Sequence, residues 1–289
     1  MEAPMYPELT EDQLATLLKG ISIPPQPQVL VDLQLEQLDP HCSIASLAHI
    51  ISQDVGLAGA VLKTVNSPFF GLTNQISSVQ QAVNLLGINS VISLVNAHSI
   101  RGVLSDEQII ALGKFWDTAI DIAQVATQVA KQIGIDSPEE AYTLGLFHNC
   151  GIPLLMMRHP NYQEVMEMAY ADSVSNINET ENRLLNTNHC VVGYYVAKSW
   201  KLPLHICLAI HHHHQVDLQI ASPSVDNREK NLLAVLKIAE HLCGNHMILG
   251  QHNEDHEWHR LEEQILIYVG LSKYDLENLQ QSLADQGLL

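Results

Sequence analysis

The chain has 289 residues, which is long enough to bury a large core in one or two domains without cross-links. Its 14 Lys and Arg residues against 32 Asp and Glu residues give a formal net charge of −18, which argues against nucleic acid or an anionic membrane as a partner, because both require a basic surface. Because 46% of the residues are hydrophobic and 16% are charged, we expect the chain to fold rather than to be disordered.

Residues 1–16 are acidic and interrupted by proline, and they lack the basic and apolar regions of a signal peptide. No apolar run in the chain approaches the roughly 18 residues that cross a membrane. We therefore predict a helical lead at residues 1–16 and a cytoplasmic protein. The cysteines are odd in number and form no C-x-x-C pair, which favours reduced thiols in that compartment.

Each cysteine lies within two residues of a histidine. The five are Cys42, Cys150, Cys190, Cys207 and Cys243. We interpret them as small buried apolar side chains, with a metal-ligating thiolate as the less favoured alternative.

A Ser or Thr followed three residues later by Glu or Gln, which is the pattern of a helix start, recurs along the chain. The instances begin at Thr10, Ser78, Ser105 and Ser137. Between them, apolar residues recur with helical spacing, as at Ile122, Val125 and Val129, and strand-like alternation is scarce. We therefore predict an all-α, multi-helix globule, with a loop at residues 219–229 before a C-terminal helical part.

The first hundred residues contain a series of short motifs. They read IPPQP at residues 23–27, IISQD at 50–54, LKTVNSPFFG at 62–71 and ISSVQQAVNLLG at 76–87. The prolines stiffen an opening turn, and Pro68 ends a helix because the residue before a proline disfavours the helical region. None of these residues is an obvious acid, base or nucleophile. We interpret this half as scaffold or as a surface for a partner.

The second half contains a further series, in which histidine is concentrated. Its motifs read FWDT at residues 115–118, LFHNCGI at 146–152, HCVVG at 189–193, AIHHHH at 209–214 and IAE at 238–240.

Together and in this order, the two series strongly resemble the HDOD family, a bacterial signalling relative of the HD-domain metal-dependent phosphohydrolases. The resemblance implies an HDOD domain at residues 17–215, with an N-terminal helical half to about residue 104 and a degenerate HD-like half from about residue 105. Residues 216–289 are then a C-terminal helical extension that completes the HD-like site at Glu240.

The resemblance also implies a metal site with altered ligands. HD phosphohydrolases bind one or two metal ions through a His, an adjacent His-Asp pair, further His residues and a final Asp. Here Thr118 stands at the first His position and Asn149 at the Asp of the pair, and neither is a good transition-metal ligand. The ligands left for one divalent transition metal ion (Fe, Mn, Ni or Zn) are His148, His189, His213, His214 and Glu240.

Helical phase supports a single cluster. Thr118, His189 and Glu240 each lie on an apolar stripe, so we expect them to face inward and to be paired or liganded there. A hydrogen-bonded relic of the site, without metal, is the leading interpretation.

Two other histidine groups are interpreted as polar surface. The run at residues 211–214 winds around a helix, so at most two members can share a face, here His211 and His214; one or two members are expected to face inward and the others to be solvated. The histidines at 252, 256 and 259 have metal-ligand spacing, but neighbouring acidic residues, Glu257 among them, favour a solvated acidic face.

These observations favour a bacterial, cytoplasmic signal-transduction protein that acts by binding a separate signalling protein, and we assign no catalytic residue. The resemblance implies a connection with two-component or cyclic-dinucleotide signalling. One alternative is a metal-dependent phosphohydrolase or phosphodiesterase that acts on nucleotides or other phosphate esters. A second alternative is a metal or redox sensor that uses the same cluster.

Overall fold

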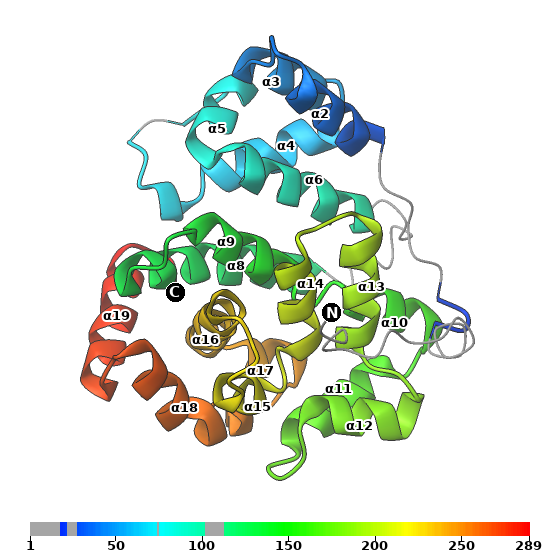
Figure 1. The fold of residues 1–289 in the computed structure, drawn as a ribbon, viewed down its shortest axis with the longest axis vertical. Coiled ribbons are helices and arrows are strands. Elements are labelled where there is room, and N and C mark those ends of the chain that lie inside the picture. The colour runs from blue at the N-terminus through cyan, green and yellow to red at the C-terminus, as the bar shows by residue number, and fades with distance from the viewer. Residues whose placement is uncertain (1–17, 22–27, 74, 102–112) are drawn as a thin grey trace.

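The computed structural model describes residues 18–21, 28–73, 75–101 and 113–289 (Figure 1). Every regular element in these ranges is helical, which confirms the predicted all-α class. Some expectations concern segments outside the described residues: the lead at 1–16, the proline turn at 23–27, the helix starts at Thr10 and Ser105, and the division near residues 104–105. None of the described helices has the length and apolar character needed to cross a bilayer.

The N-terminal helices form a layer at one end of the molecule (Figure 1). They are α2 (Gln28–Leu38), α3 (Ile44–Ser52), α4 (Val55–Val65), the 3-10 helix η1 (Pro68–Phe70), α5 (Val79–Leu86) and α6 (Ile88–Arg101). Ser78 caps α5 by accepting a hydrogen bond from the backbone N–H of Gln81, as its sequence pattern predicts. Helix α6 packs on α9 and so joins this layer to the main body.

The remaining helices form the main body. They are α8 (Gly113–Ile133), α9 (Pro138–Phe147), α10 (Ile152–Arg158), α11 (Tyr162–Ala171), α12 (Ile177–Leu185), α13 (His189–Ser199), α14 (Leu204–His212), α15 (Val216–Ala221), α16 (Asn227–Leu242), α17 (Asn245–Leu249), α18 (His256–Val269) and α19 (Lys273–Asp285). Helix α16 packs against α8, α9, α14 and α18, and most of its residues are buried. It therefore carries its polar side chains into the interior.

Helices α8 and α9 pack closely against each other. The predicted apolar stripe of α8, including Ile122 and Val125, is buried. Gly145 of α9 lies so near α8 that a Cβ there would be 2.7 Å from the Cα of Ala123. This close contact brings the end of α9, where His148 follows, to the centre of the body.

Helix α10 begins where it crosses α13, and glycine occupies both sides of the crossing. A Cβ at Gly151 would overlap the carbonyl oxygen of His189 and would lie 2.9 Å from the backbone nitrogen of Gly193. The backbone at Gly151 thus packs directly on the backbone of α13, and this contact fixes the position at which α13 begins.

Two predicted features, a loop and a helix start, differ in part from the structure. The loop predicted at residues 219–229 is shorter, at 222–226, because α15 continues to Ala221 and α16 begins at Asn227 with Asp226 as its cap. Ser137 precedes α9 as predicted, with Pro138 in the first turn, but its side chain makes no capping hydrogen bond.

Candidate metal centre

The residues singled out in the sequence lie on five helices or directly after them. Thr118 is on α8, His148 and Asn149 follow α9, His189 opens α13, His213 and His214 follow α14, and Glu240 is on α16. All of these side chains are buried, as helical phase predicts for Thr118, His189 and Glu240.

His189 is held by a carboxylate. Its Nδ1 donates a 2.6 Å hydrogen bond to Glu181 Oε2, and both side chains are fully buried. The Tyr162 hydroxyl donates a 2.6 Å hydrogen bond to Glu181 Oε1. Because a carboxylate accepts, the proton of His189 lies on Nδ1 and its Nε2 presents a lone pair.

His148 and His213 are held by main-chain carbonyls. The Nδ1 of His148 donates to the carbonyl oxygen of Gly145, and the Nδ1 of His213 donates to that of Ile210, each at 2.7 Å. Both histidines follow the last turn of a helix, where carbonyl groups lack helical partners. A carbonyl oxygen can only accept, so the Nδ1 of each ring carries a proton.

His214 is held by a residue that the sequence analysis placed on the surface. Its Nδ1 lies 2.7 Å from Glu257 Oε1. The ammonium of Lys237 lies 3.3 Å from the same nitrogen and 2.9 Å from Glu257 Oε2. The shorter contact assigns the Nδ1 proton to the hydrogen bond with Glu257. The prediction that Glu257 belongs to a solvated acidic face is therefore wrong.

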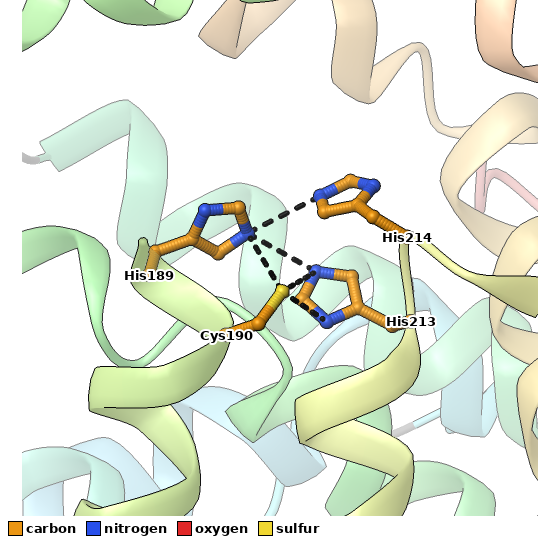
Figure 2. Close-up of side chains that lie close together, drawn as sticks. All are labelled: His189, Cys190, His213 and His214. Atoms are coloured by element: carbon orange, nitrogen blue, oxygen red, sulfur yellow. Dashed lines mark hydrogen bonds between the residues drawn. The ribbon is translucent and has the colours of Figure 1, made fainter. Parts of the chain in front are cut away.

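The three rings of His189, His213 and His214, here called the imidazole cluster, converge through their Nε2 atoms (Figure 2). The Nε2 of His189 lies 3.2 Å from that of His213 and 3.2 Å from that of His214. Because each Nδ1 atom already carries a ring proton, the three Nε2 atoms that face one another are the sites for any further proton or metal ion. This arrangement is repulsive unless a positive charge, either a metal ion or an added proton, lies among them.

The surroundings of the cluster keep two of its rings neutral. Burial lowers the pKa of His213 well below its ordinary value, and His214 and Lys237 add to the effect. Burial and Lys237 likewise lower the pKa of His214. Burial also acts to lower the pKa of His189, but Cys190 and Glu181 outweigh it and raise that pKa. Two rings therefore offer neutral donors near pH 7, as a metal ion requires.

Glu240 is already compensated by protein groups. Its Oε2 lies 2.8 Å from Lys237 Nζ, and its Oε1 accepts a 2.8 Å hydrogen bond from Asn245 Nδ2. His148 Nε2 lies 3.3 Å from Glu240 Oε1 without the alignment of a hydrogen bond. Burial acts to raise the pKa of Glu240, but Lys237 and His148 outweigh it and lower that pKa well below its ordinary value.

Asn149 contributes an unsatisfied oxygen. Its Oδ1 is buried and has no hydrogen-bond partner among the described residues. Such an atom costs about 1–3 kcal/mol, and an amide oxygen is a weak transition-metal ligand. The donors present therefore fit one metal ion at the imidazole cluster and do not fit a second ion held by Asn149 and Glu240.

Four residues of the site were not predicted as parts of it. They are Glu181, Cys190, Lys237 and Glu257. Cys190 directly follows His189, and Lys237 precedes Glu240 by one helical turn, so both had a signal in the sequence. Glu181 and Glu257 come from other helices, and only the tertiary structure brings them to His189 and His214.

The expected arrangement of the run at residues 211–214 is wrong. Helix α14 ends at His212, so His213 and His214 leave the helical spiral and both face His189. His212 is also buried, and its Nδ1 lies 2.8 Å from Glu229 Oε1. In a continuous helix, His211 would share a face with His214 instead.

The cavity beside the site is small. It measures about 10 Å³, the space of a single water molecule, and its lining includes Lys237, Glu240 and Glu257. A larger cavity of about 560 Å³ lies among α10, α11 and α17 and is lined in part by Met156 and Tyr162.

Comparison with known proteins identifies a matching family model and one curated relative. The family model described as the HDOD domain matches residues 23–216. An uncharacterized protein of Treponema pallidum (strain Nichols) is 26% identical over 200 residues, which cover 67% of this chain and 38% of that protein. The chain thus spans well under half the length of the curated relative that it matches.

Solved structures share the fold. An HDOD domain protein of unknown function from Geobacter sulfurreducens superposes with a TM-score of 0.66 at 23% identity, covering 94% of this chain and 93% of that one. A protein of Shewanella amazonensis SB2B whose name reads "Putative phosphohydrolase" gives a TM-score of 0.65 at 24% identity, covering 95% and 96%. Likeness at these identities shows the fold alone.

Proposed function

Because the chain belongs to the HDOD domain family, we propose that it is a bacterial signal-transduction protein whose HD-like half binds one divalent transition metal ion and has no phosphohydrolase activity. The observation that carries this proposal is the convergence of three buried Nε2 atoms, with His189 Nε2 at 3.2 Å from both His213 Nε2 and His214 Nε2.

The groups behind the rings are those found behind metal-binding histidines. Metal-binding histidines typically donate their second ring N–H to a carboxylate or a carbonyl, which fixes the tautomer and makes the ligand more basic. Glu181, Glu257 and the Ile210 carbonyl supply these acceptors to the three rings. Neutral imidazoles suit Zn, Fe and Ni ions, which are borderline Lewis acids.

The same geometry argues against hydrolysis. Metal-assisted hydrolysis needs an open coordination position and room for the substrate. Thr118 and Asn149 stand where the resemblance expects ligands, and Lys237 occupies the carboxylate of Glu240. The adjoining cavity of about 10 Å³ admits one water molecule rather than a phosphate ester.

The output of such a protein is an interaction with a separate signalling protein. Large apolar side chains are exposed on the N-terminal layer, which supports this role. They are Leu35 and Leu38 on α2, Ile44 on α3 and Leu85 on α5. A partner identified by capture on the native chain is expected to be lost with Leu38→Glu, whereas the metal content stays unchanged.

The proposal is tested on protein purified without a histidine tag. Elemental analysis is expected to find about one transition metal ion per chain. Hydrolysis assays on activated phosphodiesters with Mn, Fe, Ni and Mg are expected to show no turnover above that of the His148→Ala variant.

Each alternative has its own outcome. Turnover that His148→Ala abolishes would establish the phosphohydrolase or phosphodiesterase and overturn our proposal. If no metal binds after reconstitution with Zn, Fe, Mn and Ni, the imidazole cluster is a hydrogen-bonded relic of a metal site, with a proton shared among its Nε2 atoms. Metal binding that changes the affinity for the captured partner would favour the sensor.

A further inference from the structure

We propose that the fourth ligand of this ion is the thiolate of Cys190, so that the site is a tetrahedral centre of three imidazole nitrogens and one sulfur that selects Zn²⁺ over Mn²⁺. The inference rests on the proposed function, and it replaces Glu240 and His148 of the predicted ligand set with a residue that had been interpreted as a buried apolar side chain.

The four side chains point toward a common centre in Figure 2. His189, Cys190, His213 and His214 are all buried, and one ligand atom from each lies within 4.8 Å of the others. Among the described residues, it is the group of three or more His, Cys, Asp or Glu side chains placed to hold a metal ion.

Four of the six spacings among the ligand atoms are close to those around a tetrahedral ion, and the other two are within 4.8 Å. With metal–nitrogen bonds of about 2.05 Å and a metal–sulfur bond of about 2.3 Å, two nitrogens are about 3.3 Å apart and sulfur is about 3.6 Å from each nitrogen. The Nε2 atom of His189 lies 3.2 Å from those of His213 and His214. The Sγ of Cys190 lies 3.6 Å from His189 Nε2 and 3.8 Å from His213 Nε2. It also lies 3.3 Å from His213 Nδ1, so the His213 ring has to turn for its Nε2 and the sulfur to face the same ion.

The nearest rival ligand is the carboxylate of Glu240. It is bound by Lys237 at 2.8 Å and by Asn245 at 2.8 Å, so recruiting it would leave a buried ammonium without part of its compensation. Cys190 compensates no buried charge: its Sγ makes weak contacts to Asn178 Oδ1 at 3.2 Å and to His213 Nδ1 at 3.3 Å.

One helix supports both ligands at the start of α13. Asn178 and Glu181 lie three residues apart on the buried face of α12, where Asn178 contacts Cys190 and Glu181 contacts His189. Cys190 directly follows His189 in the first turn of α13, so both ligands start from the same helix end.

Metal binding at this site is coupled to loss of a proton. The S–H bond of Cys190 breaks, its proton passes to solvent, and the sulfur electron pair forms the bond to the metal, without any change of oxidation state. A half-turn of the Asn178 amide then presents its NH₂ group to the thiolate, in place of the oxygen that faces the thiol. One thiolate and three imidazoles select Zn²⁺ over the harder Mn²⁺.

Cobalt(II) titration of the full chain, after removal of bound metal by a chelator, tests the inference. One equivalent is expected to give the intense visible bands of a tetrahedral ion together with a near-ultraviolet thiolate-to-cobalt charge-transfer band. Cys190→Ser is expected to abolish the charge-transfer band and to weaken cobalt binding by about tenfold or more, since even outer-shell changes cost roughly 10–100-fold. Cys207→Ser is the matched control, because Cys207 is a buried cysteine whose Sγ donates to the Leu202 carbonyl outside the cluster; it is expected to keep both spectral features.

Two measurements on the native chain need no substitution. Zinc X-ray absorption is expected to count one sulfur and three nitrogen neighbours, and a weakly buffered indicator is expected to detect protons released on Zn²⁺ binding at pH 7, from Cys190 and from the ring of His189, whose pKa is raised. Binding of one ion with only nitrogen and oxygen neighbours would overturn the thiolate assignment and leave the proposed function standing. Failure of Co²⁺ and Zn²⁺ to bind at all would overturn both.

Discussion

The Nδ1 of His189 and the Oε2 of Glu181 lie 2.6 Å apart, and neither side chain has any exposed surface. The carboxylate fixes the tautomer of the ring and aims Nε2 at the imidazole cluster. The charge of Glu181 also favours a cation at that nitrogen, because a hydrogen-bonded carboxylate makes an imidazole more basic.

Glu181→Gln is expected to weaken Zn²⁺ binding by roughly 10–100-fold while the chain stays folded, since the substitution removes the charge but keeps the size of the side chain. Competition with a chromophoric chelator measures the affinity. Glu179→Gln, at an exposed position of the same helix, is the control and is expected to bind Zn²⁺ as the native chain does. Equal affinity for the Glu181 variant would contradict the assigned hydrogen bond.

Lys237→Met is expected to lower the free energy of unfolding by about 3–5 kcal/mol, because it leaves the carboxylates of Glu240 and Glu257 buried without their cation. Adding Glu257→Gln is expected to restore part of the loss. Urea denaturation measures both. Lys273→Met removes the exposed ion pair with Glu262 and is expected to cost less than about 1 kcal/mol. A cost this small for Lys237→Met would mean that its ion pairs contribute little.

Asn149→Asp, alone and combined with Thr118→His, is expected to strengthen metal binding, because it places an anionic oxygen where a buried amide oxygen now has no partner. Without metal, the buried carboxylate destabilises the chain, so the gain in melting temperature on adding Zn²⁺ should exceed that of the native protein. Thermal unfolding with and without the ion measures this gain. Asn161→Asp, at an exposed position, should leave the gain in melting temperature as it is in the native chain. An equal gain in all variants would refute the assignment of Asn149 to the Asp position of the HD-type His-Asp pair.

His211 is expected to make the protein less stable in mild acid. Burial, with a smaller effect of His212, lowers the pKa of His211 to about 4, whereas an unfolded histidine titrates near 6.5. Between these values the unfolded chain binds more protons, so stability falls as pH falls from about 6.5 toward 4.

His211→Gln is expected to reduce the difference in unfolding free energy between pH 7 and pH 5 by on the order of 1 kcal/mol. Urea titrations at the two pH values measure this difference. His259→Gln, at an exposed position, should leave the difference as it is in the native chain. If His211→Gln has no more effect than this control, His211 is protonated in the folded state at pH 5.

Local sequence signals predicted the helices well because caps and apolar stripes act over one or two turns. Ser78 caps α5, and the stripe through Ile122 and Val125 is buried. The same periodicity failed at residues 211–214, where the helix ends within the run and turns His213 toward His189.

The environment of the candidate site could not be predicted in this way. Glu257 lies 43 positions after His214 in the chain, in an acidic, histidine-rich segment that reads as surface. Only the tertiary structure shows its role, because it brings Glu257 to His214 and places Lys237 of α16 beside both. The polar character of these residues was plain in the sequence, whereas their burial depends on which helices meet.

The crossing of α10 and α13 has a genetic consequence. The obstacle to any side chain at Gly151 is the backbone of His189 and Gly193, which is the same whatever residues stand there. A change elsewhere in the chain that trims a side chain would therefore create no space at this point. We expect substitutions at Gly151 to have no second-site suppressors, and revertants selected for restored function to recover glycine itself.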